Sequence, residues 1–339
     1  MIDIPLLLPL FKNTIRKNEF FFQIAAGYIQ EQIFDFVDSV ADADFLLLPY
    51  NYFDARLHKT YFNYFLDLAK QSGKRVIVFD YSDFHEEVVI PHAIVFRTSL
   101  YRSDDRKNEY SVSPFVEDLS DTVGLIIRHK GDRVKPVISF CGWASNATKI
   151  AALKVLFRNL FWNLRSLFTM NRFLLLRKKG LYFRINVISK LLKSNKIISN
   201  FIIRKTYSGH KKTIGMDYEQ ARKEYVSNML DSDFVLTIKG DGNYSQRFFE
   251  ALSVGRIPLF IDTDSVLPCE DIIDYNKFIL RVDYNRLKDL DSIVSDFFRN
   301  LSEDEFVEMQ QAAFIAFKEH LRVDAFIRHI VEILKKNKY

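Results

Sequence analysis

An arginine and a glutamate three residues apart, Arg247 and Glu250, are the side chains best suited to chemistry on a phosphorylated ligand. They follow a glycine-bearing turn, 240–242, which itself follows a short apolar run. A strand, tight turn and helix in this order place the helix N-terminus at the carboxyl edge of a parallel sheet, where its N–H groups attract phosphate. Lys239 adds a cation. The sequence therefore predicts an anion-binding turn here.

Arg247 and Glu250 have two possible uses, which their spacing alone does not separate. They can pair with each other, or Glu250 can accept both hydroxyls of a ribose while Arg247 meets a diphosphate. The turn contains neither the Gly-Lys-Ser of a Walker A loop nor the pattern GxGxxG. ATP hydrolysis and nicotinamide chemistry are therefore disfavoured.

The elements around this pair are predicted from apolar runs and helix signals. We expect strands at 234–238 and 257–261, and a helix at 244–254 that Asn243 caps. Strands at 137–140 and 278–282 flank them in the chain. The first of these leads to a turn at Cys141, Gly142 and Trp143 and to a helix capped by Ser145 or Asn146.

The N-terminal half alternates strands with a helix. Continuous apolar runs predict strands at 20–24, 43–48, 75–79 and 93–96, and helical spacing predicts a helix within 56–72. Continuous rather than alternating apolar runs indicate a parallel sheet that is covered on both faces.

Two loops of this half follow the carboxyl ends of strands and carry polar side chains. Open parallel sheets bind ligands at this edge. The loop 49–58 offers Asp54 and His58, and the loop 80–87 offers Asp83, His85 and Glu86. Each is a candidate general base, and each could instead be an ordinary turn or cap residue.

Length and composition place the chain among two-domain globular proteins. It has 339 residues, of which 48% are hydrophobic, so global disorder is excluded. No run of 18 apolar residues is present, and the apolar start lacks a basic leader and a cleavage site. Cys141 and Cys269 form neither a disulfide framework nor a metal spacing. We therefore expect a cytoplasmic protein.

Basic residues are concentrated in one stretch. Between Arg133 and Met216 there are 18 Lys and Arg and no Asp or Glu, so the rest of the chain carries −13 against a total of +5. Apolar residues at helical spacing indicate one or two amphipathic helices here. The stretch could be a solvated face, a surface for an anionic membrane or lipid phosphate, or a nucleic-acid surface, which is disfavoured because no binding motif accompanies it. The candidate contacts are Arg177, Lys178, Lys179 and Arg184.

The C-terminal part is predicted to be mainly helical. Apolar periodicity predicts helices at 218–230, 287–301, 303–321 and 323–336. Ser302 and Glu305 have the spacing of a capping box, which marks the start of the third of these helices.

The run from Ser232 to Phe278 resembles the C-terminal half of exostosin-type glycosyltransferases. It shares their strand, Lys-Gly turn, Ser-x-Arg-Phe-x-Glu-Ala-Leu helix, Gly-x-Ile-Pro strand and Leu-Pro loop. Weaker similarities lie at 44–49, at 136–142 and from Gln310 onward.

The resemblance implies an α/β fold of the GT-B type, with two Rossmann-like domains whose parallel sheets face each other across a cleft. We expect an acceptor domain at 1–125 and a nucleotide-sugar domain at 132–320, with a basic insertion at 151–212. The last helix, 322–339, could pack back on the first domain.

The resemblance also implies residue roles. Glu250 would bind the donor ribose, and Arg247, Lys239 and the Gly142 turn would surround the diphosphate of a nucleoside-diphosphate sugar. Ser245 and Gly242 belong to the same donor site.

The family inverts configuration at the anomeric carbon, which implies one general base for the acceptor hydroxyl, here Asp83, His85 or Asp54. The helix dipole and basic side chains can stabilise the leaving group, so we expect neither a tightly bound cofactor nor a required metal.

We expect neither the Golgi anchor nor the disulfides of animal exostosins in this protein, and its basic insertion has no clear counterpart in them. We therefore expect a bacterial enzyme that builds a surface polysaccharide, lipopolysaccharide O-antigen or capsule, on a lipid-linked acceptor. It would be peripheral on the inner face of the plasma membrane and bind no nucleic acid. The alternative is a non-catalytic Rossmann-like protein that binds nucleotides or an anionic polymer.

Overall fold

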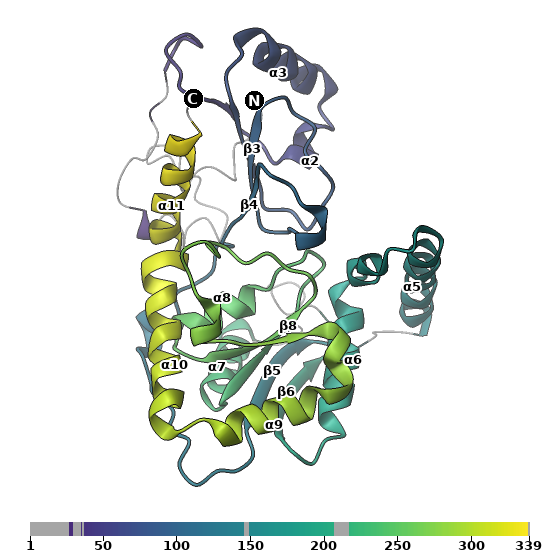
Figure 1. Cartoon of the computed structure of the whole chain (residues 1–339), viewed down its shortest axis with the longest axis vertical. Coiled ribbons are helices and arrows are strands. Elements are labelled where there is room, and N and C mark those ends of the chain that lie inside the picture. Colours follow the sequence, from purple (N-terminus) through teal and green to yellow (C-terminus); the bar gives the residue numbers. More distant parts are fainter. Residues whose placement is uncertain (1–26, 30–34, 36, 146–148, 207–216, 338–339) are drawn as a thin grey trace. The chain divides into compact units, whose positions relative to one another are not determined.

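The computed structural model describes residues 27–29, 35, 37–145, 149–206 and 217–337, so the predicted strand at 20–24 and Asn146 lie outside it. The chain forms two compact units (Figure 1). Unit 1 comprises Met1–Glu117, Ser265–Ile273 and Lys318–Tyr339, and unit 2 comprises Asp118–Asp264 and Asp274–Phe317.

Unit 1 is built on a four-stranded parallel sheet. Its strands β1 (Leu46–Leu48), β2 (Val76–Asp80), β3 (Ala93–Arg97) and β4 (Glu109–Ser111) follow one another in that order. Every residue of β2 and β3 is buried, as their continuous apolar sequences predict. The sequence analysis did not predict β4, because its three residues, Glu-Tyr-Ser, contain no apolar run.

Three helices complete the described part of unit 1. Helices α2 (Tyr52–Ala55) and α3 (Lys59–Ser72) share a hydrophobic core with β1, β2 and β3. Helix α3 ends at Gly73 in the left-handed conformation (φ 64°), which glycine adopts without a steric cost. The C-terminal helix α11 (Val323–Lys336) also belongs to this unit, where Nη1 of Arg75 donates to Asn337 Oδ1 at 2.9 Å.

Unit 2 is built on a five-stranded parallel sheet. The strand order is β6 (Ile198–Arg204), β5 (Val137–Trp143), β7 (Phe234–Thr237), β8 (Ile257–Asp262) and β9 (Leu280–Asp283). Strands β5 and β6 pair over seven positions, from Val137 with Ile198 to Trp143 with Arg204.

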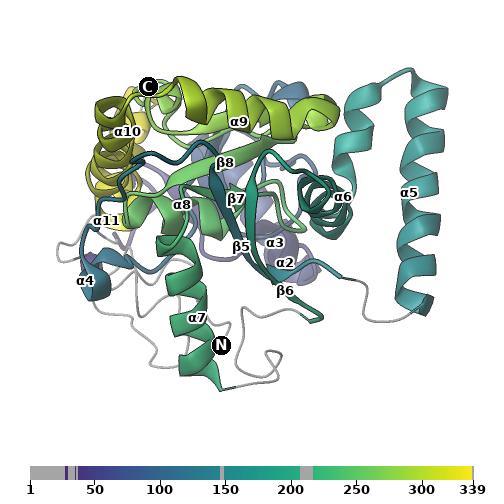
Figure 2. The same cartoon turned by 90° about the horizontal axis from the view of Figure 1, so that it is seen from below.

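Helices cover both faces of this sheet (Figure 2). Phe234 and Leu236 of β7 share a core with α6 (Gly180–Leu192) and α9 (Leu290–Asn300). Val235 between them packs with α7 (Tyr218–Leu230) and α8 (Gln246–Ser253) on the opposite face. Successive residues of a strand point to opposite faces, so a strand covered on both sides must be apolar throughout. The prediction of α/β domains built on parallel sheets is confirmed, and their arrangement across a cleft stays a prediction.

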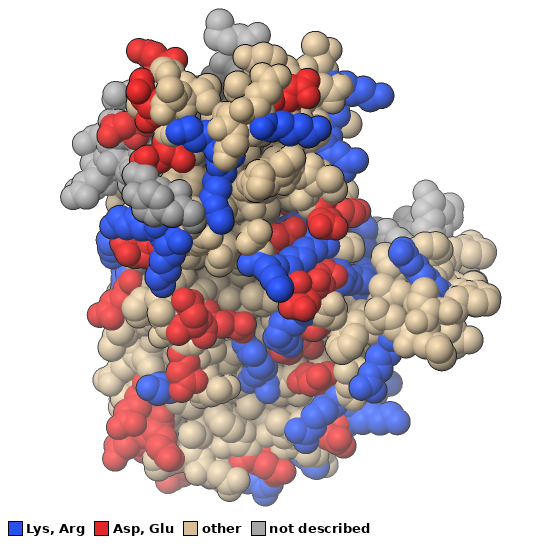
Figure 3. All heavy atoms as spheres, turned by 45° about the horizontal axis from the view of Figure 1, so that its top comes forward, with Lys and Arg blue, Asp and Glu red and all other residues tan. Residues whose placement is uncertain are grey.

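The basic stretch is not an insertion over its whole length. Strand β6 is hydrogen-bonded to β5, and α6 contributes Phe183, Val187 and Leu191 to the core. No described residue of α5 (Lys149–Thr169) belongs to this core, and α5 packs against the 3-10 helix η3 (Arg172–Arg177), whose Leu176 does belong to it. The region at the right of Figure 3, where Figure 1 places α5, is largely neutral on this face. Residues 207–212 lie outside the described residues.

Unit 2 starts at Asp118, earlier than the boundary predicted between 125 and 132. The reason is Leu119, which packs in the core between α7 and α8 and whose N–H donates to Ser253 Oγ at 3.1 Å. Further along the segment, the buried carboxylate of Asp233 accepts from Arg128 Nε at 2.8 Å, Arg133 Nη1 at 2.6 Å and the Val137 N–H at 2.7 Å. The polar segment before β5 is therefore tied to unit 2 by charge-assisted hydrogen bonds.

The C-terminal helices agree closely with the prediction. Helices α7 and α11 have the predicted bounds, and Ser302 and Glu305 form the predicted capping box of α10 (Glu303–Ala316). Helix α10 stops five residues earlier than predicted, and a π-helical turn, Phe317–Leu321, follows it.

Candidate functional site

Positive side chains gather at the carboxyl edge of the unit 2 sheet. Gly142 and Arg204 lie at the ends of β5 and β6, Lys239 follows β7, and Arg247 lies in the first turn of α8. The strands are parallel, so their carboxyl ends share one edge. Gly142 lies within β5 rather than in a turn, because the pairing with β6 continues through Trp143.

Arg247 is held at the end of β5. Its Nη2 donates to the backbone oxygen of Cys141 at 2.7 Å, and its guanidinium lies over the ring of Phe140, 4.4 Å from the centroid. A β-carbon on Gly142 would lie 2.7 Å from this Nη2. The buried Nε of Arg247 has no hydrogen-bond acceptor in the chain. Arg247 therefore uses one of its five donors to fix its position, and binding of an anion by the others stays a prediction.

Glu250 does not pair with Arg247, so that interpretation of their spacing is wrong. Its Oε1 accepts from Arg222 Nη1 at 3.0 Å, and its Oε2 accepts from the Tyr225 hydroxyl at 2.5 Å. The side chain is 13% exposed. A carboxylate has about four acceptor positions. Two of them hold Glu250 to α7, and two remain for a ligand.

Tyr225 and Arg222 were not predicted as site residues. Burial raises the pKa of the Tyr225 phenol well above 10, and the negative charge of Glu250 raises it further. The phenol therefore stays protonated and donates to Glu250. The available sequence signal was weak: an arginine and a tyrosine three residues apart on the helix before β7.

Cys141 contributes its backbone rather than its thiol. Burial raises the pKa of this thiol, although the nearby guanidinium groups of Arg204 and Arg247 oppose the change. Arg204 also forms an ion pair with Glu224 of α7. The thiol is thus kept neutral beside a cluster of cations.

Lys239 is buried in unit 2. Its side chain is 2% exposed, its Nζ donates to the Leu176 oxygen at 2.8 Å, and it lies 5.2 Å from the centroid of the Phe183 ring. These contacts tie the turn after β7 to η3 and α6. A role for Lys239 at a diphosphate stays a prediction.

The N-terminus of α6 meets the same turn. A β-carbon on Gly180 would lie 2.3 Å from the backbone oxygens of both Lys239 and Gly240. Only glycine allows this approach. Lys179, directly before it, pairs with Asp241 at 2.6 Å.

The four basic residues predicted as a membrane or acceptor surface lie around this helix start. Lys178 is 6% exposed, with Nζ 4.4 Å from the centroid of the Tyr182 ring, and Arg177 and Arg184 are half-buried. Only Lys179 is exposed. They do not form the expected exposed basic face, because the apolar side of α6 draws its N-terminus against the turn.

Helix α8 begins two residues later than predicted. Ser245 occupies the N-cap position without a side-chain capping bond, and Asn243 Oδ1 accepts instead from Thr263 Oγ1 at 2.8 Å. Asn243 thus links the turn to the end of β8 rather than capping the helix. Ser245 and Gly242 are both buried beside the helix start.

The candidate bases lie in unit 1: Asp54 in α2 and His58 at the N-cap of α3, so the predicted loop 49–58 is partly helical, and the others on the loop after β2. Asp54, His58, Asp83 and Glu86 are exposed. His85 is half-buried, and its ring centroid lies 5.4 Å from that of Tyr101.

Contacts between the two loops confirm that they are neighbours. The Phe53 and Phe84 rings lie 4.7 Å apart, and the Tyr52 hydroxyl accepts from the Val89 N–H at 3.0 Å. The buried Arg97 donates to the Phe84 and Glu86 oxygens and to Asp80, each at 2.9 Å. The loops are therefore preorganised, although these contacts do not select one base.

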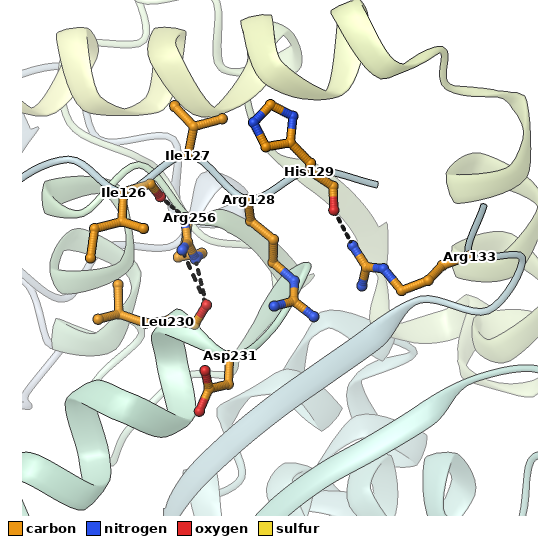
Figure 4. Close-up of a pocket in the computed structure, with 8 residues that line it drawn as sticks. All are labelled: Ile126, Ile127, Arg128, His129, Arg133, Leu230, Asp231 and Arg256. Atoms are coloured by element: carbon orange, nitrogen blue, oxygen red, sulfur yellow. Dashed lines mark hydrogen bonds between the residues drawn. The ribbon is translucent and has the colours of Figure 1, made fainter. Parts of the chain in front are cut away.

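A hollow of about 450 Å³ lies at the other edge of the unit 2 sheet (Figure 4). Its arginines serve the chain itself: Arg256 donates to the backbone oxygens of Ile126 and Leu230, and Arg128 and Arg133 bind Asp233. Burial lowers the pKa of Arg256 to about 10, which leaves it charged at neutral pH. This hollow lies away from the residues predicted to act.

The family comparison covers the predicted donor-site residues except Gly142. A model of the Exostosin GT47 domain matches residues 176–297. The similarity to that domain extends over this segment of the chain. The match contains Lys239, Arg247 and Glu250, and it begins in η3, so the basic stretch from residue 176 onward does have a counterpart in the exostosin family.

Two solved structures are similar to the chain at low identity. TarM shares 12% identity over 77% of this chain and 50% of its own, with a TM-score of 0.38. A glycosyltransferase from Rickettsia africae ESF-5 shares 13% identity over 81% of this chain and 80% of its own, with a TM-score of 0.32. The chain thus corresponds to half the length of TarM. No curated protein matches the sequence.

Proposed function

We propose that the protein transfers a sugar from a nucleoside-diphosphate sugar to a hydroxyl of a growing glycan. The observation that carries this proposal is the carboxylate of Glu250, held by Arg222 and Tyr225 one helical turn from a guanidinium with unused donors. A carboxylate and a guanidinium in this arrangement suit a ribose and a diphosphate.

The two free acceptor positions of Glu250 would take the two ribose hydroxyls. The diphosphate would lie over the end of β5, where Gly142 makes room for the Arg247 guanidinium, and would meet Arg247 and the first N–H groups of α8. Cations and helix N-termini stabilise the charge that develops on a departing diphosphate. The proposed reaction therefore needs no tightly bound cofactor and no metal.

The proposed reaction is a single displacement with inversion. The acceptor oxygen attacks the anomeric carbon as the bond from that carbon to the β-phosphate oxygen breaks. The acceptor proton passes to a general base, and the nucleoside diphosphate leaves with the electron pair. Asp83, His85 and Asp54 remain the proposed bases.

For the acceptor, we propose a lipid-linked glycan of a bacterial surface polysaccharide, O-antigen or capsule, handled at the inner face of the plasma membrane. The acid-free stretch between Arg133 and Met216 supports an anionic partner.

The test is ligand-induced stabilisation of the full chain by uridine, guanosine and adenosine diphosphates. A nucleotide at a hundredfold excess over its dissociation constant should add about 2.7 kcal/mol to the free energy of unfolding. The matching 2′,3′-dideoxynucleotide should stabilise less, because it lacks the hydroxyls that Glu250 would accept.

Glu250→Gln is the matched variant, since it keeps size and changes charge. We expect it to weaken nucleotide binding at least about tenfold and to abolish transfer or slow hydrolysis of the sugar nucleotide. Stabilisation without any turnover of a nucleotide sugar would favour the non-catalytic alternative. Full activity of Glu250→Gln would overturn the site.

A further inference from the structure

Helix α5 carries its apolar side chains on the outside. Large apolar residues at helical spacing are exposed by 48% or more, up to 84% at Phe168. They include Leu156, Phe157, Leu160, Leu164, Leu167 and Phe168. Exposed apolar residues scattered singly are normal in a soluble protein, whereas a contiguous patch on one element indicates a partner.

Two polar side chains of the same helix face inward. Asn159 and Ser166 are each 8% exposed, and Ser166 Oγ donates to the Asn171 oxygen at 2.8 Å where α5 turns into η3. At 100° per residue the exposed apolar residues span one face, and Asn159 and Ser166 lie on the opposite face. A helix that only covered a soluble core would have these faces reversed.

Charge indicates what covers this face. The helix contains four basic residues and no acidic one, within a stretch of 84 residues that has no Asp or Glu. Helical spacing places the exposed Arg165 on the flank of the apolar face, next to Phe161 and Phe168. A second copy would bring another acid-free basic helix against the first, whereas an anionic surface complements it.

The length and composition of the helix favour lying on a bilayer rather than crossing it. In the described part of the chain, no helix is both long and apolar enough to cross a membrane. Helices that lie in a membrane interface combine an apolar face, a basic flank and an aromatic side chain such as Trp. In α5 this side chain is Trp162, and the guanidinium of Arg165 lies 5.7 Å from the centroid of its ring.

We propose that α5 inserts its apolar face into the headgroup and acyl boundary of an anionic bilayer. The inference deepens the proposed function, because it names the element that would bring the enzyme to a lipid-linked acceptor. It differs from the sequence-based prediction in its residues: exposed leucine and phenylalanine side chains of α5 make the contact, not Arg177, Lys178, Lys179 and Arg184.

The test is co-sedimentation of the full chain with vesicles of phosphatidylglycerol and phosphatidylcholine. The triple variant Leu160→Asn, Leu164→Asn, Phe168→Asn should lower the partition coefficient at least about a hundredfold, since each large apolar side chain contributes roughly tenfold. The matched control is Ile315→Asn, which changes a 49% exposed apolar residue on α10. This control should bind vesicles as the parent does.

A second measurement tests the charge. Arg165→Gln should weaken binding to anionic vesicles, and raised salt should also weaken it. At low salt, vesicles of phosphatidylcholine alone should bind less protein than anionic vesicles do. Unchanged vesicle binding of the triple variant would overturn the proposal. The proposal would also be overturned if the parent were a dimer and the triple variant a monomer that still binds vesicles. In that case α5 would be an interface between copies of the chain.

The nucleotide readout separates this inference from the proposed function. All α5 variants should keep the parent's stabilisation by nucleoside diphosphate, because none of them touches the carboxyl edge of the sheet. If Glu250→Gln loses nucleotide binding but binds vesicles normally, the result bears on the donor site and not on α5. Absent vesicle binding of a parent that binds nucleotide refutes the α5 proposal alone.

Discussion

The guanidinium of Arg247 occupies the space that a side chain on Gly142 would need, since a β-carbon there would lie 2.7 Å from Nη2. We predict that Gly142→Ala pushes Arg247 off the Cys141 oxygen. Nucleoside diphosphate affinity should fall at least about tenfold, and the free energy of unfolding by about 1–3 kcal/mol, as for overpacking elsewhere. Calorimetric titration and urea unfolding measure the two effects.

Gly73→Ala is the control for this variant. Gly73 has a left-handed backbone (φ 64°) with open space around it, so alanine there adds strain without an atomic clash. Its cost of about 1 kcal/mol should leave nucleotide affinity unchanged. Equal loss of affinity in both variants would refute the specific contact between Gly142 and Arg247.

Gly180→Ala should be more destabilising than Gly142→Ala. The obstacles at Gly180 are the backbone oxygens of Lys239 and Gly240, at 2.3 Å, and backbone yields less easily than the end of an arginine side chain. We expect a loss of more than about 3 kcal/mol, measured by urea unfolding. A loss smaller than that of Gly142→Ala would show that α6 can move away from the turn cheaply.

Tyr225→Phe should loosen the carboxylate of Glu250. The variant removes the hydroxyl that donates to Oε2 and leaves the bond from Arg222, so stability should fall by about 1–2 kcal/mol. The ratio of ribonucleotide to dideoxynucleotide affinity should shrink several-fold. Tyr64→Phe, at an exposed site of α3, is the control and should change neither quantity. An undiminished ratio would mean that Tyr225 does not position Glu250.

Glu303 should contribute an acid-sensitive term to stability. The Gly131 N–H, His129 and the Lys130 N–H bind its carboxylate, and the backbone bond of Gly131 has the largest effect in lowering its pKa below 4.5. For a lowered carboxyl pKa, the stabilisation is fully present above the unfolded value and is lost as pH falls through the folded value. Stability should therefore decline below about pH 4.5.

Urea midpoints between pH 3 and 7 test this term. Glu303→Gln should flatten the acid limb of the stability curve, whereas Glu308→Gln, at an exposed position of the same helix, should leave it unchanged. Identical acid limbs in the parent and Glu303→Gln would contradict the prediction.

Much of the architecture follows from local sequence patterns. The bounds of α7 and α11 and the capping box of α10 depend on periodicity and on side chains a few residues away. Apolar runs in the sequence predicted the described strands of both sheets, apart from β4 and β6. Strand β6 lies in the basic stretch, where its Asn200 and Arg204 obscure the pattern, and its place at the edge of the sheet leaves it incompletely buried.

The candidate site was only half visible in the sequence. Arg247 and Glu250 were found because they are close in the chain, but their partners Cys141, Arg222 and Tyr225 lie on other elements. Asn243 was predicted to cap α8 because local spacing allows it, yet Thr263, from the end of β8, binds it instead. Local pairing rules cannot anticipate a partner that arrives from a neighbouring strand.

By itself, the sequence determined the α/β class, the strand, turn and helix that carry Arg247 and Glu250, and the concentration of positive charge between Arg133 and Met216. Only the tertiary structure decided how those charges are used. Packing the apolar face of α6 into the core buries Lys178 against Tyr182, while α5 turns Asn159 and Ser166 inward and large apolar residues outward. Charge and hydrophobicity are properties of residues, but exposure is a property of the packed chain.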